Sequence, residues 1–238
     1  MNQSSASSRL SDAVHDLANE VVLALRSGGH LATVCGAAGI HEDDRTGIAA
    51  VRVIGADLLL PSVLYGQSPH PGDVAVFHRA VRDFPPRPDA SPSTAWSHWA
   101  MLSTLHRVAP SLPTGFPAGG PPALDEPGIT GLDDAPWQAF SHQVSLLAPL
   151  AVPAAASSVA RIARGRATDL ARGFVRAVRR RDWLQASGTG RWLAALGGEP
   201  PTLGLDRGLD FVELMAGQDP RVALNVRAAR LMIEERGR

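Results

Sequence analysis

The sequence contains no lysine, so all 23 of its cationic side chains are arginine. Schiff-base chemistry and the phosphate-binding loop that ends in lysine both need a lysine amine, which excludes these two kinds of site. The Gly-x-Ser-x-Gly nucleophile motif is also missing. The use of Arg and Ala in place of Lys and Ile is typical of GC-rich coding, and it indicates no function by itself.

Cysteine and aromatic residues are also scarce. The single Cys35 excludes an internal disulfide and an all-cysteine metal cage. Aromatic residues make up only 5% of the chain, so the core must consist mainly of Ala, Leu and Val, which favours packed helices over a β-sandwich. The longest apolar stretch, residues 48–65, is interrupted by charged residues and a proline, so we expect no membrane span and a cytoplasmic protein.

Helical periodicity predicts a mainly α protein built as a multi-helix bundle. Apolar residues recur at three- and four-residue spacing over residues 9–26, and Asp219-Pro220 is a typical cap and first-turn proline for a last helix that ends near Glu235. Residues 30–60 are ambiguous, because the alternation of Val51 and Val53 allows a small β-hairpin whereas the flanking alanine and leucine runs allow buried helices.

Proline and glycine are concentrated in residues 110–131, which predicts a linker or loop. This division gives an acidic N-terminal region, residues 1–109, and an arginine-rich helical region, residues 132–238. The alternative is one domain that includes all three parts.

The charges are unevenly distributed along the chain. Residues 1–150 hold 14 acids and 8 arginines, whereas residues 151–238 hold 9 acids and 15 arginines. Residues 154–184 are predicted to form one long helix with an arginine face and an alanine-rich face. The arginine face contains Arg161, Arg164, Arg172, Arg176, Arg179 and Arg180.

A row of guanidinium groups along a helix suits carboxylate or phosphate recognition. We therefore predict a binding or assembly subunit that contacts an acidic partner, with nucleic acid fitting better than an acidic protein or a membrane surface. Two other interpretations stay open, namely a solvated face and a face that docks on the acidic half of the same chain. The predicted binding residues are Arg161, Arg172, Arg176, Arg179 and Arg180.

A helical enzyme that depends on haem or a divalent metal is the alternative. Its candidate catalytic residues are His98, His106 and His142. The run from His41 to Asp44 combines an imidazole with carboxylates and so supplies candidate metal ligands, His41, Glu42 and Asp44. The sequence indicates no substrate and no oligomeric state.

Overall fold

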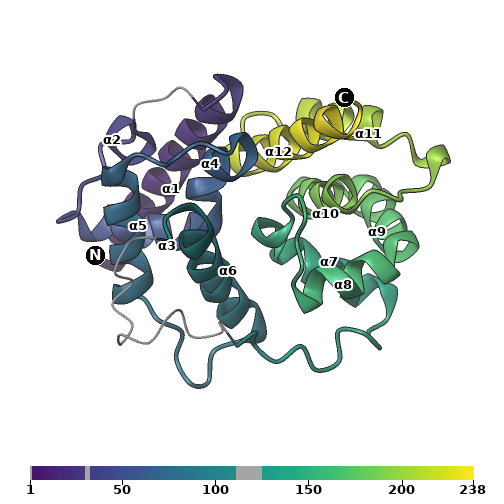
Figure 1. The fold of residues 1–238 in the computed structure, drawn as a ribbon, viewed down its shortest axis with the longest axis horizontal. Helices are drawn as coiled ribbons and strands as arrows, with labels where there is room; N and C mark the ends of the chain where they lie inside the picture. The colour runs from purple at the N-terminus through teal and green to yellow at the C-terminus, as the bar shows by residue number, and fades with distance from the viewer. Residues whose placement is uncertain (1, 30–32, 111–124) are drawn as a thin grey trace. The chain divides into compact units, whose positions relative to one another are not determined.

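The computed structural model describes residues 2–29, 33–110 and 125–238 (Figure 1). All regular elements of these residues are helices and none is a strand, which confirms the predicted mainly α fold. The described chain divides into two compact units, Met1–Pro127 and Gly128–Arg238. The boundary falls within the predicted linker, of which residues 111–124 lie outside the described residues, and the division into domains stays a prediction.

The first unit is a helical cluster in which α3 and the 3₁₀ turn η1 occupy the centre. The helix α3 contacts α1 and α5, and η1 contacts α6. The elements are α1 (Asn2–Arg26), α2 (Val34–Ala37), α3 (Arg45–Ile54), η1 (Gly55–Leu59), α4 (Leu60–Tyr65), α5 (Pro71–Asp83) and α6 (Pro92–Val108).

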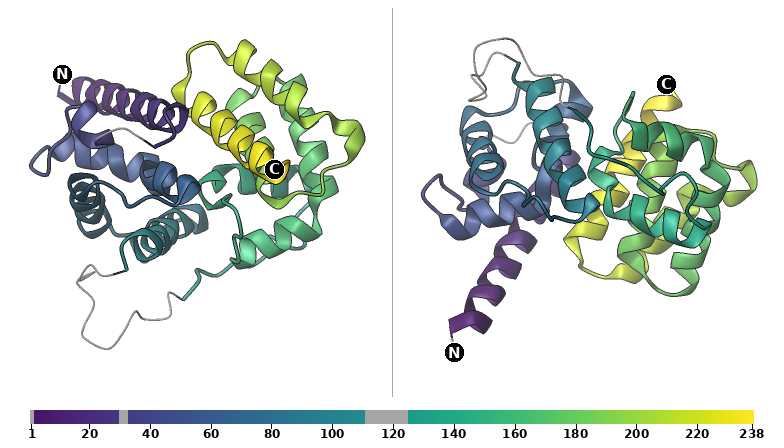
Figure 2. Two further views of the ribbon diagram at one scale, coloured as in Figure 1. Left: turned by 45° about the horizontal axis from the view of Figure 1, so that its top comes forward. Right: turned by 90° about the horizontal axis from the view of Figure 1, so that it is seen from below.

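The periodicity of residues 9–26 is confirmed as part of α1. Leu17, Val21 and Leu25 are fully buried, so the predicted apolar stripe faces the core of the first unit. The first turns of α1 extend beyond the other helices of the unit, and residues 5–9 are exposed (Figure 2). Only the C-terminal part of this helix is therefore held by packing.

The β-hairpin considered for residues 30–60 is not supported. Residues 30–32 lie outside the described residues, and the remainder forms α2, α3 and η1. Asp44 caps α3 by accepting a hydrogen bond from the Thr46 amide at 3.0 Å. Ile48, Val51 and Ile54 are buried at three-residue spacing, so the helical period outweighs the short alternation that allowed a strand.

One stretch of the described residues, Arg45–Tyr65, is long and apolar enough to cross a membrane, and 67% of its most apolar window is buried inside the protein. Gly55 interrupts the stretch with φ = 66°, a left-handed conformation that glycine adopts without a steric penalty. The burial and the break both suit the core of a folded unit, in agreement with the expectation of no membrane span.

The second unit is a bundle in which α10 is the central helix. It contacts all the other α-helices of the unit, and Trp192 on it donates a hydrogen bond to the Val144 carbonyl at 2.8 Å. The elements are α7 (Trp137–Leu146), η2 (Ala148–Leu150), α8 (Ser158–Gly165), α9 (Ala167–Arg179), α10 (Trp183–Leu196), η3 (Pro201–Leu203), α11 (Leu205–Ala216) and α12 (Pro220–Arg236).

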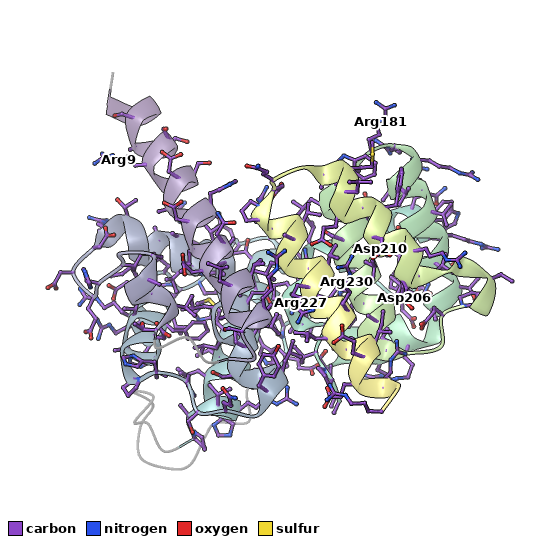
Figure 3. All side chains as sticks on the ribbon, turned by 90° about the horizontal axis from the view of Figure 1, so that it is seen from above. Arg9, Arg181, Asp206, Asp210, Arg227 and Arg230 are labelled. Atoms are coloured by element: carbon purple, nitrogen blue, oxygen red, sulfur yellow. The ribbon has the colours of Figure 1, made fainter. Side chains whose placement is uncertain are left out.

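The last helix begins at the predicted cap, because Asp219 accepts a hydrogen bond from the Arg221 amide at 3.0 Å and Pro220 occupies the first turn. Arg230 of α12 then pairs with two acids of α11, with 2.5 Å to Asp210 and 2.8 Å to Glu213. Figure 3 shows Asp210 and Arg230 between the two helices. These two ion pairs neutralise the charge of Arg230 within the second unit.

Candidate nucleic-acid interface

The prediction of one long helix over residues 154–184 is wrong. The chain forms α8 and α9 as separate helices and then turns into α10. Ser157 caps α8 by accepting from the Ala160 amide at 3.2 Å, and Ala154 before it has φ = 58°. The helical path ends at Gly165 and resumes at Ala167. The predicted arginine face is therefore divided between two helices.

Arg166 holds the junction between α8 and α9. Its Nε and Nη2 atoms donate to one oxygen of Asp169 at 2.9 and 2.7 Å, and its Nη1 donates to the carbonyls of Leu132 and Asp133 at 3.2 and 2.9 Å. The guanidinium also lies 4.1 Å from the ring centroid of Phe140. All of these contacts are internal, so Arg166 serves the fold of the second unit.

The C-terminal end of α9 is a sharp turn. Arg180 is the C-cap residue, and Arg181 follows with φ = 58°, which is unusual for a residue with a side chain. Asp182 then caps α10 by accepting from the Gln185 amide at 3.1 Å. Figure 3 shows Arg181 at this turn, pointing away from the helices of its unit.

The apolar side of α9 packs into the second unit and leaves the arginine side outward. Leu170, Phe174 and Ala177 are buried, and α9 contacts both α7 and α10. Gly173 allows α7 to approach closely, because a Cβ atom at this position would lie 2.3 Å from the Cβ of Ser141. The orientation of the remaining arginines on α9 is therefore set by core packing.

The outward side of α9 forms one wall of a hollow of about 790 Å³, and we call it the arginine hollow. Every residue that lines it belongs to the second unit. The other walls come from the start of α7 and from the segment around η3. The lining residues are Trp137, Thr168, Ala171, Arg172, Val175, Arg176, Arg179, Arg180, Pro200, Thr202 and Leu203.

The hollow keeps most of its positive charge. Among the described residues, Arg176, Arg179 and Arg180 have no carboxylate within ion-pair distance, and Arg172 lies 3.6 Å from Asp169. That single acid is already bound by Arg166 at 2.7 Å. Arg179 and Arg180 are exposed. A ligand with several negative charges would therefore meet guanidinium groups that the fold has not neutralised.

The hollow also presents an aromatic ring and an apolar surface. Trp137 is partly exposed, and the Arg176 guanidinium lies 5.8 Å from the centroid of its ring. Val175 is 36% exposed beside the arginines, and Leu203 and Pro200 supply apolar surface from the facing segment. The lining thus combines cationic groups with an apolar surface on which a flat apolar group can lie.

The structure brings together four of the five predicted binding residues, because Arg172, Arg176, Arg179 and Arg180 all line the hollow. Arg161 does not line it, since this residue lies on α8, where it is exposed. Arg164 of the predicted arginine face is also exposed on α8. The break at Arg166 separates these two residues from the others.

The three candidate catalytic histidines do not lie together in one site within either unit. His98 and His106 both lie on α6 of the first unit, the former half-buried and the latter exposed. Burial first and the charge of Arg52 second lower the pKa of His98, and its Nδ1 has no hydrogen-bond partner among the described residues. His142 is exposed on α7 of the second unit.

The predicted metal ligands have separate roles in the described structure. His41 and Glu42 are exposed, whereas the Asp44 side chain caps α3. No cluster of three or more His, Cys, Asp or Glu side chains suited to a metal ion occurs in the described part of the chain. The geometry of these residues therefore supports a polar turn followed by a helix cap.

Several residues of the hollow were missed by the sequence reasoning. Trp137 lies 35 residues before Arg172, and Thr202 and Leu203 lie 22 and 23 residues after Arg180, so no local pattern connects them to the arginine segment. Trp137 follows Pro136 at a helix start and lies at helical spacing from the buried Phe140 and Val144, so the sequence pattern alone assigns its ring to the apolar stripe of α7.

Two buried polar groups were also missed, and both are structural. Arg191 is fully buried on α10, where Nε donates to the Ala151 carbonyl at 3.1 Å and Nη1 donates to Asn225 Oδ1 at 3.2 Å. Asp73 of α5 accepts from the Val34 and Cys35 amides at 2.9 and 2.8 Å and so caps α2.

Comparison of the chain with models of protein families, with curated proteins and with solved structures finds no match. The function must therefore be argued from the arginine hollow itself.

Proposed function

We propose that this protein binds nucleic acid through the arginine hollow of its second unit. The guanidinium groups of Arg172, Arg176, Arg179 and Arg180 would contact backbone phosphates, because each presents a planar set of donors that matches two phosphate oxygens. These contacts hold the backbone without reading base identity, so the expected binding is weakly dependent on sequence.

The observation that carries this proposal is the retained charge of the hollow. Other arginines of the second unit are paired internally, among them Arg166 with Asp169 and Arg230 with Asp210 and Glu213, whereas Arg161 and Arg164 are exposed on α8 away from the hollow. Three arginines of the hollow have no such partner among the described residues. Residues 128–238 contain 15 arginines and 11 acids, so the unit as a whole also attracts a polyanion.

The haem- or metal-dependent enzyme proposed as the alternative gains no support from the geometry. His98 and His142 belong to different units, and His41 and Glu42 are exposed near a helix cap. No described acid–base pair faces the arginine hollow, since its lining contains no His, Asp or Glu. A binding role is therefore the function that these residues support best.

The test uses the full chain and a variant in which Arg172, Arg176, Arg179 and Arg180 are all changed to Ala. Both are titrated by fluorescence anisotropy against single- and double-stranded oligonucleotides at two salt concentrations, and a thermal melt is recorded for each. We expect salt-dependent binding by the wild type, and a large loss of affinity in the variant at an unchanged melting temperature.

Two results would contradict the proposal. Absence of salt-dependent binding by the wild type at low ionic strength excludes nucleic acid as the partner. A variant that unfolds at a clearly lower temperature, with the wild type weakened by salt when no ligand is present, indicates that the arginines serve the fold instead.

A further inference from the structure

The residues that line the arginine hollow indicate which form of nucleic acid it takes. A duplex hides its bases in the stack and offers the protein phosphates and groove edges. The cationic residues of α9 instead stand beside a hollow of about 790 Å³ that also contains Trp137 and Leu203. A hollow with apolar surface next to phosphate-binding groups is suited to a nucleotide whose base is not paired.

We propose that the arginine hollow binds single-stranded nucleic acid and receives one unpaired base against Trp137. This inference rests on the proposed function. The phosphates on either side of the base contact Arg172, Arg179 and Arg180, which line the hollow from α9 and its C-cap. Aromatic side chains in single-strand-binding proteins stack on bases of any identity in this way.

Arg176 is the residue that links the two parts of the site. Its guanidinium lies 5.8 Å from the centroid of the Trp137 ring, so a planar cation and an aromatic ring are presented together. Either group can stack on the face of a base, and the guanidinium also makes a cation–π contact with the Trp137 ring. Thr168 and Thr202 supply hydroxyl groups in the same hollow for hydrogen bonds to base edges or sugar.

The spacing of the arginines indicates how long a strand the arginine hollow can contact. Arg172 and Arg180 are eight residues apart, which corresponds to about 12 Å along the axis of α9. A distance of this size covers a few nucleotides of one strand. An oligonucleotide of about ten nucleotides is therefore long enough to occupy the site.

The first experiment uses wild-type full-length protein and three probes, namely a single-stranded oligothymidylate, a duplex of the same length, and a single strand with abasic sugars at all positions. The abasic strand retains the phosphates and lacks the bases. We expect the oligothymidylate to bind about tenfold more tightly than the abasic strand, and more tightly than the duplex. Equal affinity for all three probes would overturn the inference and leave the proposed function intact.

The second experiment changes Trp137 to Ala and to Phe, and uses Trp183→Ala as the matched control. Trp183 is partly buried in the same unit and packs against Phe211, outside the lining of the hollow. We expect W137A to weaken binding of the oligothymidylate about tenfold without changing the affinity for the abasic strand, and W137F to retain most of the affinity. W183A should leave both affinities unchanged.

The outcomes separate this inference from the proposal on which it rests. If W137A weakens binding of the abasic strand as much as that of the oligothymidylate, Trp137 acts only by holding Arg176, and the inference is overturned. If the wild-type protein binds none of the three probes in a salt-dependent way, the proposed function fails first and the inference fails with it.

Discussion

Arg166 binds the same carboxylate oxygen of Asp169 with two of its nitrogens, at 2.9 and 2.7 Å. Asp169 is the only acid between Arg161 and Arg181. Because one oxygen of this acid is engaged by Arg166 and the other lies 3.6 Å from Arg172, it forms no ion pair with Arg176, Arg179 or Arg180 further along the described segment. The pair thus stabilises the helix junction and leaves the arginine hollow cationic.

Replacing Arg166 with Ala should lower the free energy of unfolding by about 1–3 kcal/mol. The change removes charge-assisted bonds to Asp169 and leaves the carbonyls of Leu132 and Asp133 without their donor. Urea denaturation followed by circular dichroism measures the effect. The control is R164A, an exposed arginine on α8 that should change stability by less than about 0.5 kcal/mol. Equal effects of the two changes would contradict the assigned role of Arg166.

Replacing Arg181 with Gly should stabilise the protein by about 1 kcal/mol, because Arg181 adopts φ = 58° and only glycine does so without a steric cost. R180G is the matched control, since Arg180 has φ = −89° and a glycine there adds entropy to the unfolded chain. We expect the melting temperature to rise for R181G and to fall for R180G. A fall for both variants would argue against the left-handed conformation at this turn.

Stability should fall as the pH is lowered through the ordinary pKa of histidine, about 6.5. The pKa of His98 is lowered in the folded state, mainly by burial and also by Arg52, so the unfolded chain binds the proton more readily. The loss should begin near the unfolded pKa and level off below the folded pKa.

Denaturation at about pH 7.5 and about pH 5 measures this dependence, with H98Q compared to H106Q. Part of the pH dependence should disappear in H98Q, because the titrating group is removed. It should persist in H106Q, since His106 is exposed on the same helix. An unchanged pH dependence in H98Q would show that other groups cause it.

Cys35 should resist alkylation in the folded protein. Burial raises the pKa of its thiol, and the nearby carboxylate of Asp73 raises it further, so the reactive thiolate is not formed at neutral pH. Mass spectrometry after treatment with iodoacetamide should show no adduct under native conditions and one adduct in denaturant. Rapid modification of the native protein would contradict the buried, protonated thiol.

The helices that could be predicted are those whose boundaries depend on local chemistry. The apolar stripe of α1 and the Asp219-Pro220 start of α12 are properties of neighbouring residues, and both are found in the structure. The break at Arg166 could not be predicted in this way. It depends on bonds to the carbonyls of Leu132 and Asp133, more than 30 residues away in the sequence.

Part of the candidate site could also be predicted from the sequence, and part could not. The amphipathic pattern placed Arg172, Arg176 and Arg179 on one face, because these residues share a single helix whose apolar side is buried. Arg161 was grouped with them only because the helix was assumed to be continuous. The contribution of Trp137 comes from the packing of α7 against α9, which a helical pattern within one segment does not report.

The central claim is that the arginines of the hollow contact phosphates whereas those of α8 do not. The direct measurement is the slope of log K against log salt concentration for a single-stranded oligonucleotide, compared among wild type, the R179A/R180A variant and the R161A/R164A variant. On a single strand, each lost phosphate contact reduces the slope by about 0.7. We expect a reduction of about 1.4 for R179A/R180A and none for R161A/R164A. Equal reductions in the two variants would show that binding follows the overall charge of the unit and would contradict a site at the arginine hollow.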